Sequence, residues 1–96
     1  MKKIALKIDT INLPQDDSFI SLIKSILCKN IGSNGDISSI LVQIAKVDDV
    51  RIPYKTTIDL VLNSSKASLQ SESSSAHYLS SFTHALSRMQ RQLSRE

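Results

Sequence analysis

The stretch that decides the fold covers residues 77–96 and has the sequence His77-Tyr-Leu-Ser-Ser-Phe-Thr-His-Ala-Leu-Ser-Arg-Met-Gln-Arg-Gln-Leu-Ser-Arg-Glu96. An α-helix turns by about 100° per residue, so side chains three, four or seven positions apart share a face. Apolar side chains with this spacing predict the buried face of an amphipathic helix: Leu79, Phe82, Leu86, Met89 and Leu93.

Basic side chains follow the same spacing on nearly the opposite face of this predicted helix: His77, His84, Arg88, Arg91 and Arg95. No Asp or Glu interrupts the stretch before Glu96. A charged face by itself only keeps a surface helix in water. A face whose charges all have one sign, most of them from Arg, favours an anionic partner.

The composition indicates one small globular domain, which we expect to span residues 1–96. A hydrophobic fraction of 41% is enough for a compact core and argues against disorder. The single cysteine, Cys28, cannot form an internal disulfide, which fits a reducing compartment. No apolar run approaches membrane-spanning length, and residues 1–9 alternate like a strand instead of forming a signal peptide. We therefore expect a cytoplasmic protein without a membrane partner.

The rest of the chain alternates between strand and helix patterns. Period-two alternation and β-branched residues predict strands, apolar residues at helical spacing predict a first helix, and polar clusters predict turns. The predicted elements are a strand over 3–9, a helix over 19–31 stopped by Gly32, strands over 39–47 and 54–62, a turn over 63–66, a polar edge strand over 66–72, a lead-in over 73–75 and the helix over 77–96.

This β-α-β-β-β-α order predicts an α+β fold, with a four-stranded sheet that carries both helices on one face. The two helices would then lie side by side, and their outer faces would form one surface. Lys24 falls on the outer side of the first helix, and Lys29 is nearer its flank. Both lysines would extend the basic stripe of the last helix.

Patterns typical of enzymes and metal sites are weak. His77 and His84 are seven residues apart, with no Cys or carboxylate at metal-ligand spacing, and Cys28 has no His near it in sequence. Asp16–Asp17 precede a helix and are better explained as helix caps, and Asp48–Asp49 as a solvated turn. The sequence therefore predicts no catalytic residue, no metal, no cofactor and no small-molecule substrate.

With this element order and this last helix, the chain resembles the bacterial ribosome hibernation factors. These form the hibernation-promoting factor and ribosome-associated inhibitor family, also called sigma-54 modulation proteins. The resemblance is strongest over 40–47, over 57–62, at Tyr78 and over 87–95. The family's last helix has the pattern Lys-Leu-x-Arg-Gln-Leu-x-Lys, and residues 88–95, Arg-Met-Gln-Arg-Gln-Leu-Ser-Arg, match it with Arg in both Lys positions.

The resemblance implies a non-catalytic protein that binds the small ribosomal subunit in the channel used by mRNA and tRNA. Basic residues of both helices would contact ribosomal RNA, and translation would be silenced in stationary phase or stress. The chain resembles the short type of factor, without a C-terminal dimerisation domain. The candidate RNA-binding residues are Lys24, Lys29, His77, His84, Arg88, Arg91 and Arg95.

A second hypothesis is a small protein–protein interaction module that docks an acidic partner through its basic last helix. A protein-binding helix usually exposes an apolar anchor beside its charges. Tyr78 is the one candidate anchor in the sequence pattern, so the pattern favours RNA. The few aromatic residues argue against binding of single-stranded RNA on the sheet, which relies on base stacking.

Overall fold

The protein folds as a four-stranded sheet and two helices in the predicted order β-α-β-β-β-α. The computed structural model describes residues 4–13, 16–31 and 35–94. The elements are β1 (Ala5–Ile11), α1 (Asp17–Asn30), β2 (Ile37–Lys46), β3 (Tyr54–Leu62), β4 (Ser68–Ser75) and α2 (Tyr78–Ser94).

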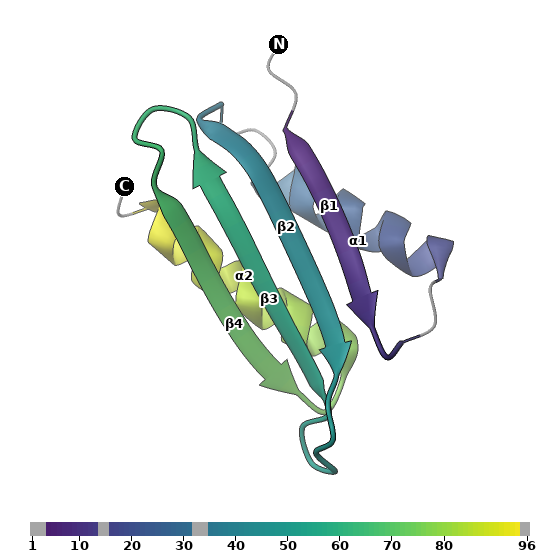
Figure 1. Cartoon of the computed structure of the whole chain (residues 1–96). Helices are drawn as coiled ribbons and strands as arrows, with labels where there is room; N and C mark the ends of the chain where they lie inside the picture. Colours follow the sequence, from purple (N-terminus) through teal and green to yellow (C-terminus); the bar gives the residue numbers. More distant parts are fainter. Residues whose placement is uncertain (1–3, 14–15, 32–34, 95–96) are drawn as a thin grey trace.

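The sheet has the strand order β1-β2-β3-β4, so β4 is an edge strand, as predicted. β1 runs parallel to β2, and the other neighbours are antiparallel. Figure 1 shows α1 behind β1 and β2 and α2 behind β3 and β4, on the same face of the sheet. The predicted α+β architecture is therefore confirmed.

The core lies between this face of the sheet and the two helices. Strand residues alternate between the two faces, so every second residue of β2 and β3 points toward the helices. The buried side chains are mainly Ile23 and Leu27 of α1, Ile40, Val42 and Ile44 of β2, Ile58, Leu60 and Leu62 of β3, and Phe82, Ala85, Leu86 and Met89 of α2. Burial of each of these side chains other than that of Ala85 stabilises the fold by roughly 1.5–3 kcal/mol.

Helix α1 begins at a cap that the sequence predicted. The Oδ1 atom of Asp16 accepts a hydrogen bond of 2.9 Å from the Ser18 amide, and Asp17 lies in the first turn. Both carboxylates favour the positive end of the helix dipole. The helix ends at Asn30, and residues 32–34 of the predicted stop signal lie outside the described residues.

Strand β4 differs most from the prediction. Lys66, predicted both as the end of the turn over 63–66 and as the first residue of this strand, has a φ of 57° and precedes the strand, which begins at Ser68. Residues 73–75, predicted as a lead-in to the last helix, continue the strand and pair with 54–56 of β3. The prediction was wrong here because the hydrogen-bonding partner, and not the polar composition, decides how far an edge strand extends.

The serines of β4 set how closely α2 approaches the sheet. Ser71 and Ser73 are buried, and the Ser71 hydroxyl donates a hydrogen bond of 2.8 Å to the Ala85 carbonyl. The hydroxyl of Thr56, on the neighbouring strand β3, lies 2.7 Å from the hydroxyl of Ser81 in α2, and both residues are buried. These small polar side chains let the helix backbone come near the strands and fix its rotation about its axis. Among the described residues, no helix is both long and apolar enough to cross a membrane.

Candidate nucleic-acid interface

The buried face of α2 decides where its basic residues point. Phe82, Leu86 and Met89 are buried as predicted, whereas Leu79, in the first turn, is 37% exposed. The small residues Ser81 and Ala85 are buried in addition. The centre of the buried face therefore lies about 50° around the helix from the centre that the apolar residues predicted. The difference is toward β4.

Arg88 lies on the flank of α2 that faces β4. Its Nη1 atom donates a hydrogen bond of 2.9 Å to the backbone carbonyl of Glu72. One turn later, Gln92 makes the same kind of contact, from Nε2 to the Gln70 carbonyl at 2.7 Å. Arg88 is exposed, but its side chain is held against β4 by this hydrogen bond, so part of its hydrogen-bonding capacity is used within the protein.

Arg91 and His84 lie on the outward side of α2. Both are exposed, and neither makes a hydrogen bond or ion pair with a described residue. Arg91 is in the last turn of the helix, where a positive charge is favoured by the helix dipole. These two side chains are available to an external anion.

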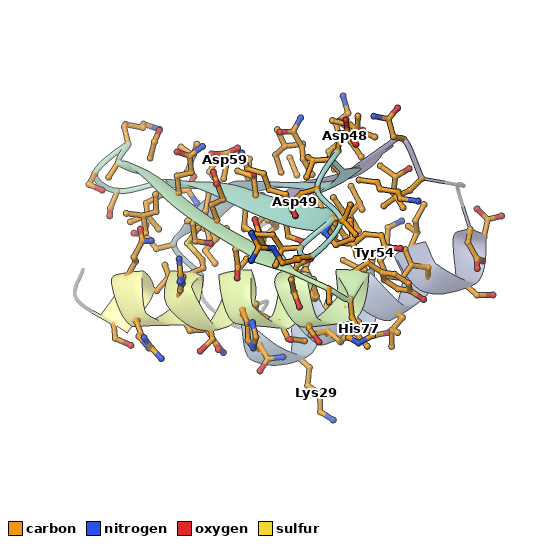
Figure 2. All side chains as sticks on the ribbon, turned by 90° about the horizontal axis from the view of Figure 1, so that it is seen from below. Lys29, Asp48, Asp49, Tyr54, Asp59 and His77 are labelled. Atoms are coloured by element: carbon orange, nitrogen blue, oxygen red, sulfur yellow. The ribbon has the colours of Figure 1, made fainter. Side chains whose placement is uncertain are left out.

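His77 lies just before the helix as the structure describes it. α2 begins at Tyr78, so the prediction that His77 shares the helical stripe was wrong. The His77 carbonyl instead accepts a hydrogen bond of 3.0 Å from the Ser81 amide, at the start of the helix, and its side chain is exposed. Figure 2 shows His77 at this end of α2. Arg95 lies outside the described residues.

The two helices lie side by side, with their starts together and their ends together. Near the starts, the ring centroids of Phe19 and Tyr78 are 4.8 Å apart. Near the ends, Gln90 Nε2 donates a hydrogen bond of 3.4 Å to Asn30 Oδ1. The side-by-side arrangement expected from the sequence is therefore present.

These contacts decide which of the two lysines of α1 lies on the same surface as the basic residues of α2. Phe19 and Asn30 mark the flank of α1 that faces α2, and Lys29 lies about 90° from that flank on the outer side. Lys24 lies about 130° from the same flank in the opposite direction around the helix, on the side of β1. Figure 2 shows Lys29 extending away from the sheet. Lys29 therefore shares the outward surface with His84 and Arg91, and Lys24 does not.

We call the surface formed by Lys29, His84 and Arg91 the outward basic face. Among the described residues of the two helices, the only carboxylate is that of Asp17, in the first turn of α1. The outward basic face therefore has a single sign of charge, and it extends from His84 in α2 to the C-terminal halves of both helices. It can bind phosphates by charge and by the two parallel N–H groups of an Arg side chain.

Sequence reasoning missed two apolar side chains next to this face. Leu22 of α1 is 45% exposed and points within about 20° of Lys29 around the helix, and Leu79 of α2 is 37% exposed. Leu79 was predicted to be buried, and the displaced rotation of α2 leaves it at the rim. The described residues contain no cluster of three or more His, Cys, Asp or Glu side chains that could hold a metal ion.

Neither a protein-family model nor a curated protein sequence matches this chain. Two solved structures share its fold over almost the whole length. A ribosomal subunit interface protein from Coxiella burnetii has a TM-score of 0.80 at 11% identity, covering 95% of this chain and 94% of that chain. The N-terminal domain of Protein Y from Thermus thermophilus has a TM-score of 0.74 at 17% identity, covering 93% of each chain. Both neighbours belong to the hibernation-promoting factor family, so the fold expected from the resemblance is confirmed.

Proposed function

We propose that this chain is a non-catalytic, cytoplasmic protein that binds the small ribosomal subunit through the outward basic face and silences translation. The observation that carries the proposal is the position of Lys29, His84 and Arg91. They come from two helices, share one surface, and have no carboxylate beside them among the described residues of the two helices. Structured RNA is recognised largely through phosphates and 2′-hydroxyls, which such a surface fits.

The proposed roles of the candidate residues follow from their contacts. Arg91 would bind a phosphate through its free guanidinium, with Lys29 and His84 on either side. Arg88 would contribute less, because it already donates to the Glu72 carbonyl. His77 and Lys24 would lie at the margins of the contact, and Arg95 would prolong the stripe beyond the last described turn.

The similar structures support a ribosomal partner. One of the two neighbours is a ribosomal subunit interface protein, with the same fold over 94% of its length. A small protein of this kind needs no catalytic group to silence translation. It acts by occupying RNA surface that mRNA and tRNA would otherwise contact, so affinity and shape are the only requirements.

One observation favours the second candidate, an acidic protein partner bound by the same two helices. Leu22 and Leu79 provide two partly exposed apolar anchors beside the basic residues. Anchors of this kind are typical of protein interfaces and are not needed for binding to phosphates.

Co-sedimentation with purified 30S and 70S ribosomes tests the proposal. The wild-type protein should pellet with 30S subunits at 50 mM salt, and Arg91→Glu should remain in the supernatant. Arg51→Glu is the matched control, because it makes the same change of charge in the exposed β2–β3 loop. Arg51→Glu should keep the wild-type unfolding free energy within about 0.5 kcal/mol, and Arg91→Glu should lower it by about 1 kcal/mol, because it reverses a charge that the helix dipole favours.

Two outcomes would contradict the RNA-binding proposal. One is equal loss of ribosome binding in Arg91→Glu and Arg51→Glu, which would indicate only a general effect of charge. The other is loss of binding in Leu22→Ser and Leu79→Ser with no loss in Arg91→Glu, which would favour the protein partner. Binding of naked 16S ribosomal RNA by the wild-type protein, but not by Arg91→Glu, would support contact with RNA.

A further inference from the structure

A pocket lies at the other end of the helix pair, where α1 and α2 begin. It is lined by Leu13, Asp16, Phe19 and Tyr78 and has a volume of about 170 Å³. Lys29 and Arg91 belong to the C-terminal halves of the same helices, and His84 points about 120° away from Tyr78 around α2. The pocket is therefore separate from the outward basic face.

The aromatic wall of the pocket is held in place by its neighbours. The rings of Phe19 and Tyr78 are 4.8 Å apart between centroids and 83° apart in orientation. The ring of Tyr54 supports Tyr78 from another side, at 5.7 Å and 78°. Although it touches two rings, Tyr78 is 45% exposed. The wall is thus fixed before a ligand arrives and remains open to solvent.

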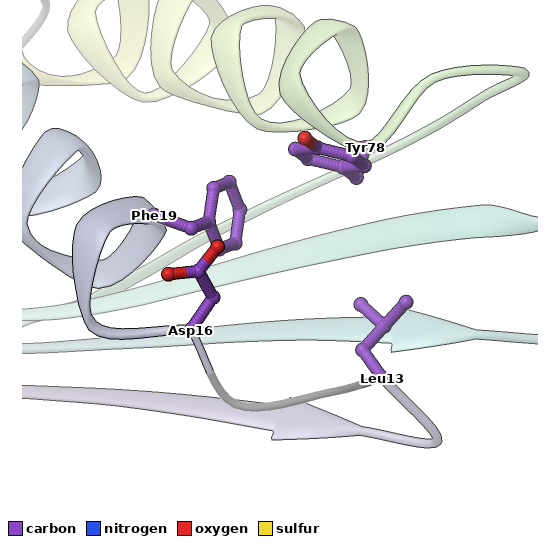
Figure 3. Close-up of a pocket in the computed structure, with 4 residues that line it drawn as sticks. All are labelled: Leu13, Asp16, Phe19 and Tyr78. Atoms are coloured by element: carbon purple, nitrogen blue, oxygen red, sulfur yellow. The ribbon is translucent and has the colours of Figure 1, made fainter.

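Asp16 supplies the polar part of the pocket. Its Oδ1 atom accepts a hydrogen bond from the Ser18 amide, and it forms no ion pair with a described residue. Figure 3 shows its carboxylate beside the ring of Phe19. A carboxylate next to two rings at right angles is complementary to a cation, because the ring faces carry partial negative charge.

The size of the pocket and its surroundings favour a polypeptide as the source of that cation. Sites for free small molecules usually have volumes of about 300–1,000 Å³, so 170 Å³ suits one side chain better. The loop that leads into Tyr54 exposes Val47, Val50 and Ile52, with Val50 99% exposed. Tyr54 packs on Tyr78 of the pocket wall, and exposed apolar side chains such as those of this loop are typical of protein interfaces.

We propose that the pocket accepts a Lys or Arg side chain from a basic polypeptide. Phe19 and Tyr78 would contact the cation and its aliphatic stem, and Asp16 would provide the opposite charge. The proposal does not rest on the ribosomal function, because no residue of the outward basic face takes part in it.

Titration of the ¹⁵N-labelled full chain with hexalysine and with hexaarginine, followed by NMR, tests this proposal. Saturable shifts are expected at the amides of Leu13, Asp16, Phe19 and Tyr78. Asp16→Asn should weaken binding about three- to tenfold. Since Asn caps a helix as well as Asp does, the fold should be unchanged in this variant.

Further variants keep the test independent of folding. Tyr78→Phe retains the ring and should bind within about twofold of wild type, whereas Tyr78→Leu should bind about three- to tenfold more weakly. Asp59→Asn removes the same charge from the uncovered face of the sheet and should have no effect.

Specific results would overturn the proposal. Wild-type affinity in Asp16→Asn, or equal shifts near Asp59 and near the pocket, would show that the peptides act only as counterions. Shifts at the pocket caused by oligouridylate instead of the basic peptides would assign it to nucleic acid.

Discussion

Two arginines three positions apart on the same helix have different surroundings. Three residues turn a helix by about 300°, so Arg88 and Arg91 point in directions about 60° apart. This is enough to place Arg88 against the Glu72 carbonyl and to leave Arg91 without a described partner. The sequence pattern placed both on one basic face, because periodicity carries no information about where the edge of the sheet lies.

The difference between these arginines predicts a difference in binding. Arg91→Ala should weaken binding to 30S subunits about tenfold, the effect of losing one charged phosphate contact. Arg88→Ala should weaken it less, because only part of that guanidinium is available to RNA. Filter binding at a single salt concentration measures both, and a larger loss for Arg88→Ala would contradict the assignment.

The buried hydroxyl pair between β3 and α2 gives a prediction for stability. Ser81 donates its one hydroxyl hydrogen to the Tyr78 carbonyl at 2.8 Å, so Thr56 is the donor in the 2.7 Å contact with Ser81. Ser81→Ala would leave the fully buried Thr56 hydroxyl without this acceptor and should cost about 1–3 kcal/mol. Thr56→Val leaves Ser81 with its bond to Tyr78 and should cost less, about 1 kcal/mol.

Urea unfolding of both single variants and of the double variant checks this order. The double variant should be less destabilised than the sum of the single changes, because no unsatisfied hydroxyl remains. Strict additivity would mean that the two hydroxyls do not interact in solution.

At the scale of elements, the sequence predicted best what is decided locally. The apolar spacing of Phe82, Leu86 and Met89 was sufficient to place α2, although the centre of its buried side lies about 50° from the predicted centre. The extent of β4 could not be predicted in this way, because Ser73 and its neighbours have little preference for a strand by themselves. They become a strand by pairing with β3, and their small size brings α2 close to the sheet.

The rotation of α2 predicts unequal effects for two leucines that the sequence pattern treats alike. Leu86 is 4% exposed and Leu79 is 37% exposed. Leu86→Ala should cost roughly 2–5 kcal/mol, as large-to-small changes in a core do, whereas Leu79→Ala should cost less than about 1 kcal/mol. Ser87→Ala, next to Leu86, serves as the control and should have almost no effect. Chemical denaturation measures all three, and equal losses for the two leucines would show that the helix has a different rotation.

For the whole molecule, the arrangement of the helices decides which lysine of α1 contributes to the candidate site. From the sequence, Lys24 was the residue on the outer side of α1 and Lys29 was nearer its flank. The contacts of Phe19 with Tyr78 and of Asn30 with Gln90 reverse that order with respect to α2. Helical spacing gives the angle between two side chains, but only tertiary packing gives the direction of the neighbouring helix.

The salt dependence of ribosome binding tests this whole-molecule arrangement. Each neutralised phosphate contributes about 0.7–0.9 to the slope of log affinity against log salt. If Lys29, Arg88, Arg91 and Arg95 each neutralise one phosphate, the slope should be about −3, and affinity should fall some tens-fold between 50 and 200 mM salt. Lys29→Ala should make the slope shallower by about one unit, and Lys24→Ala should leave it nearly unchanged. A shallower slope for Lys24→Ala together with an unchanged slope for Lys29→Ala would place the RNA on the β1 side of α1. An affinity that does not respond to salt would exclude a phosphate-binding surface and favour a protein partner.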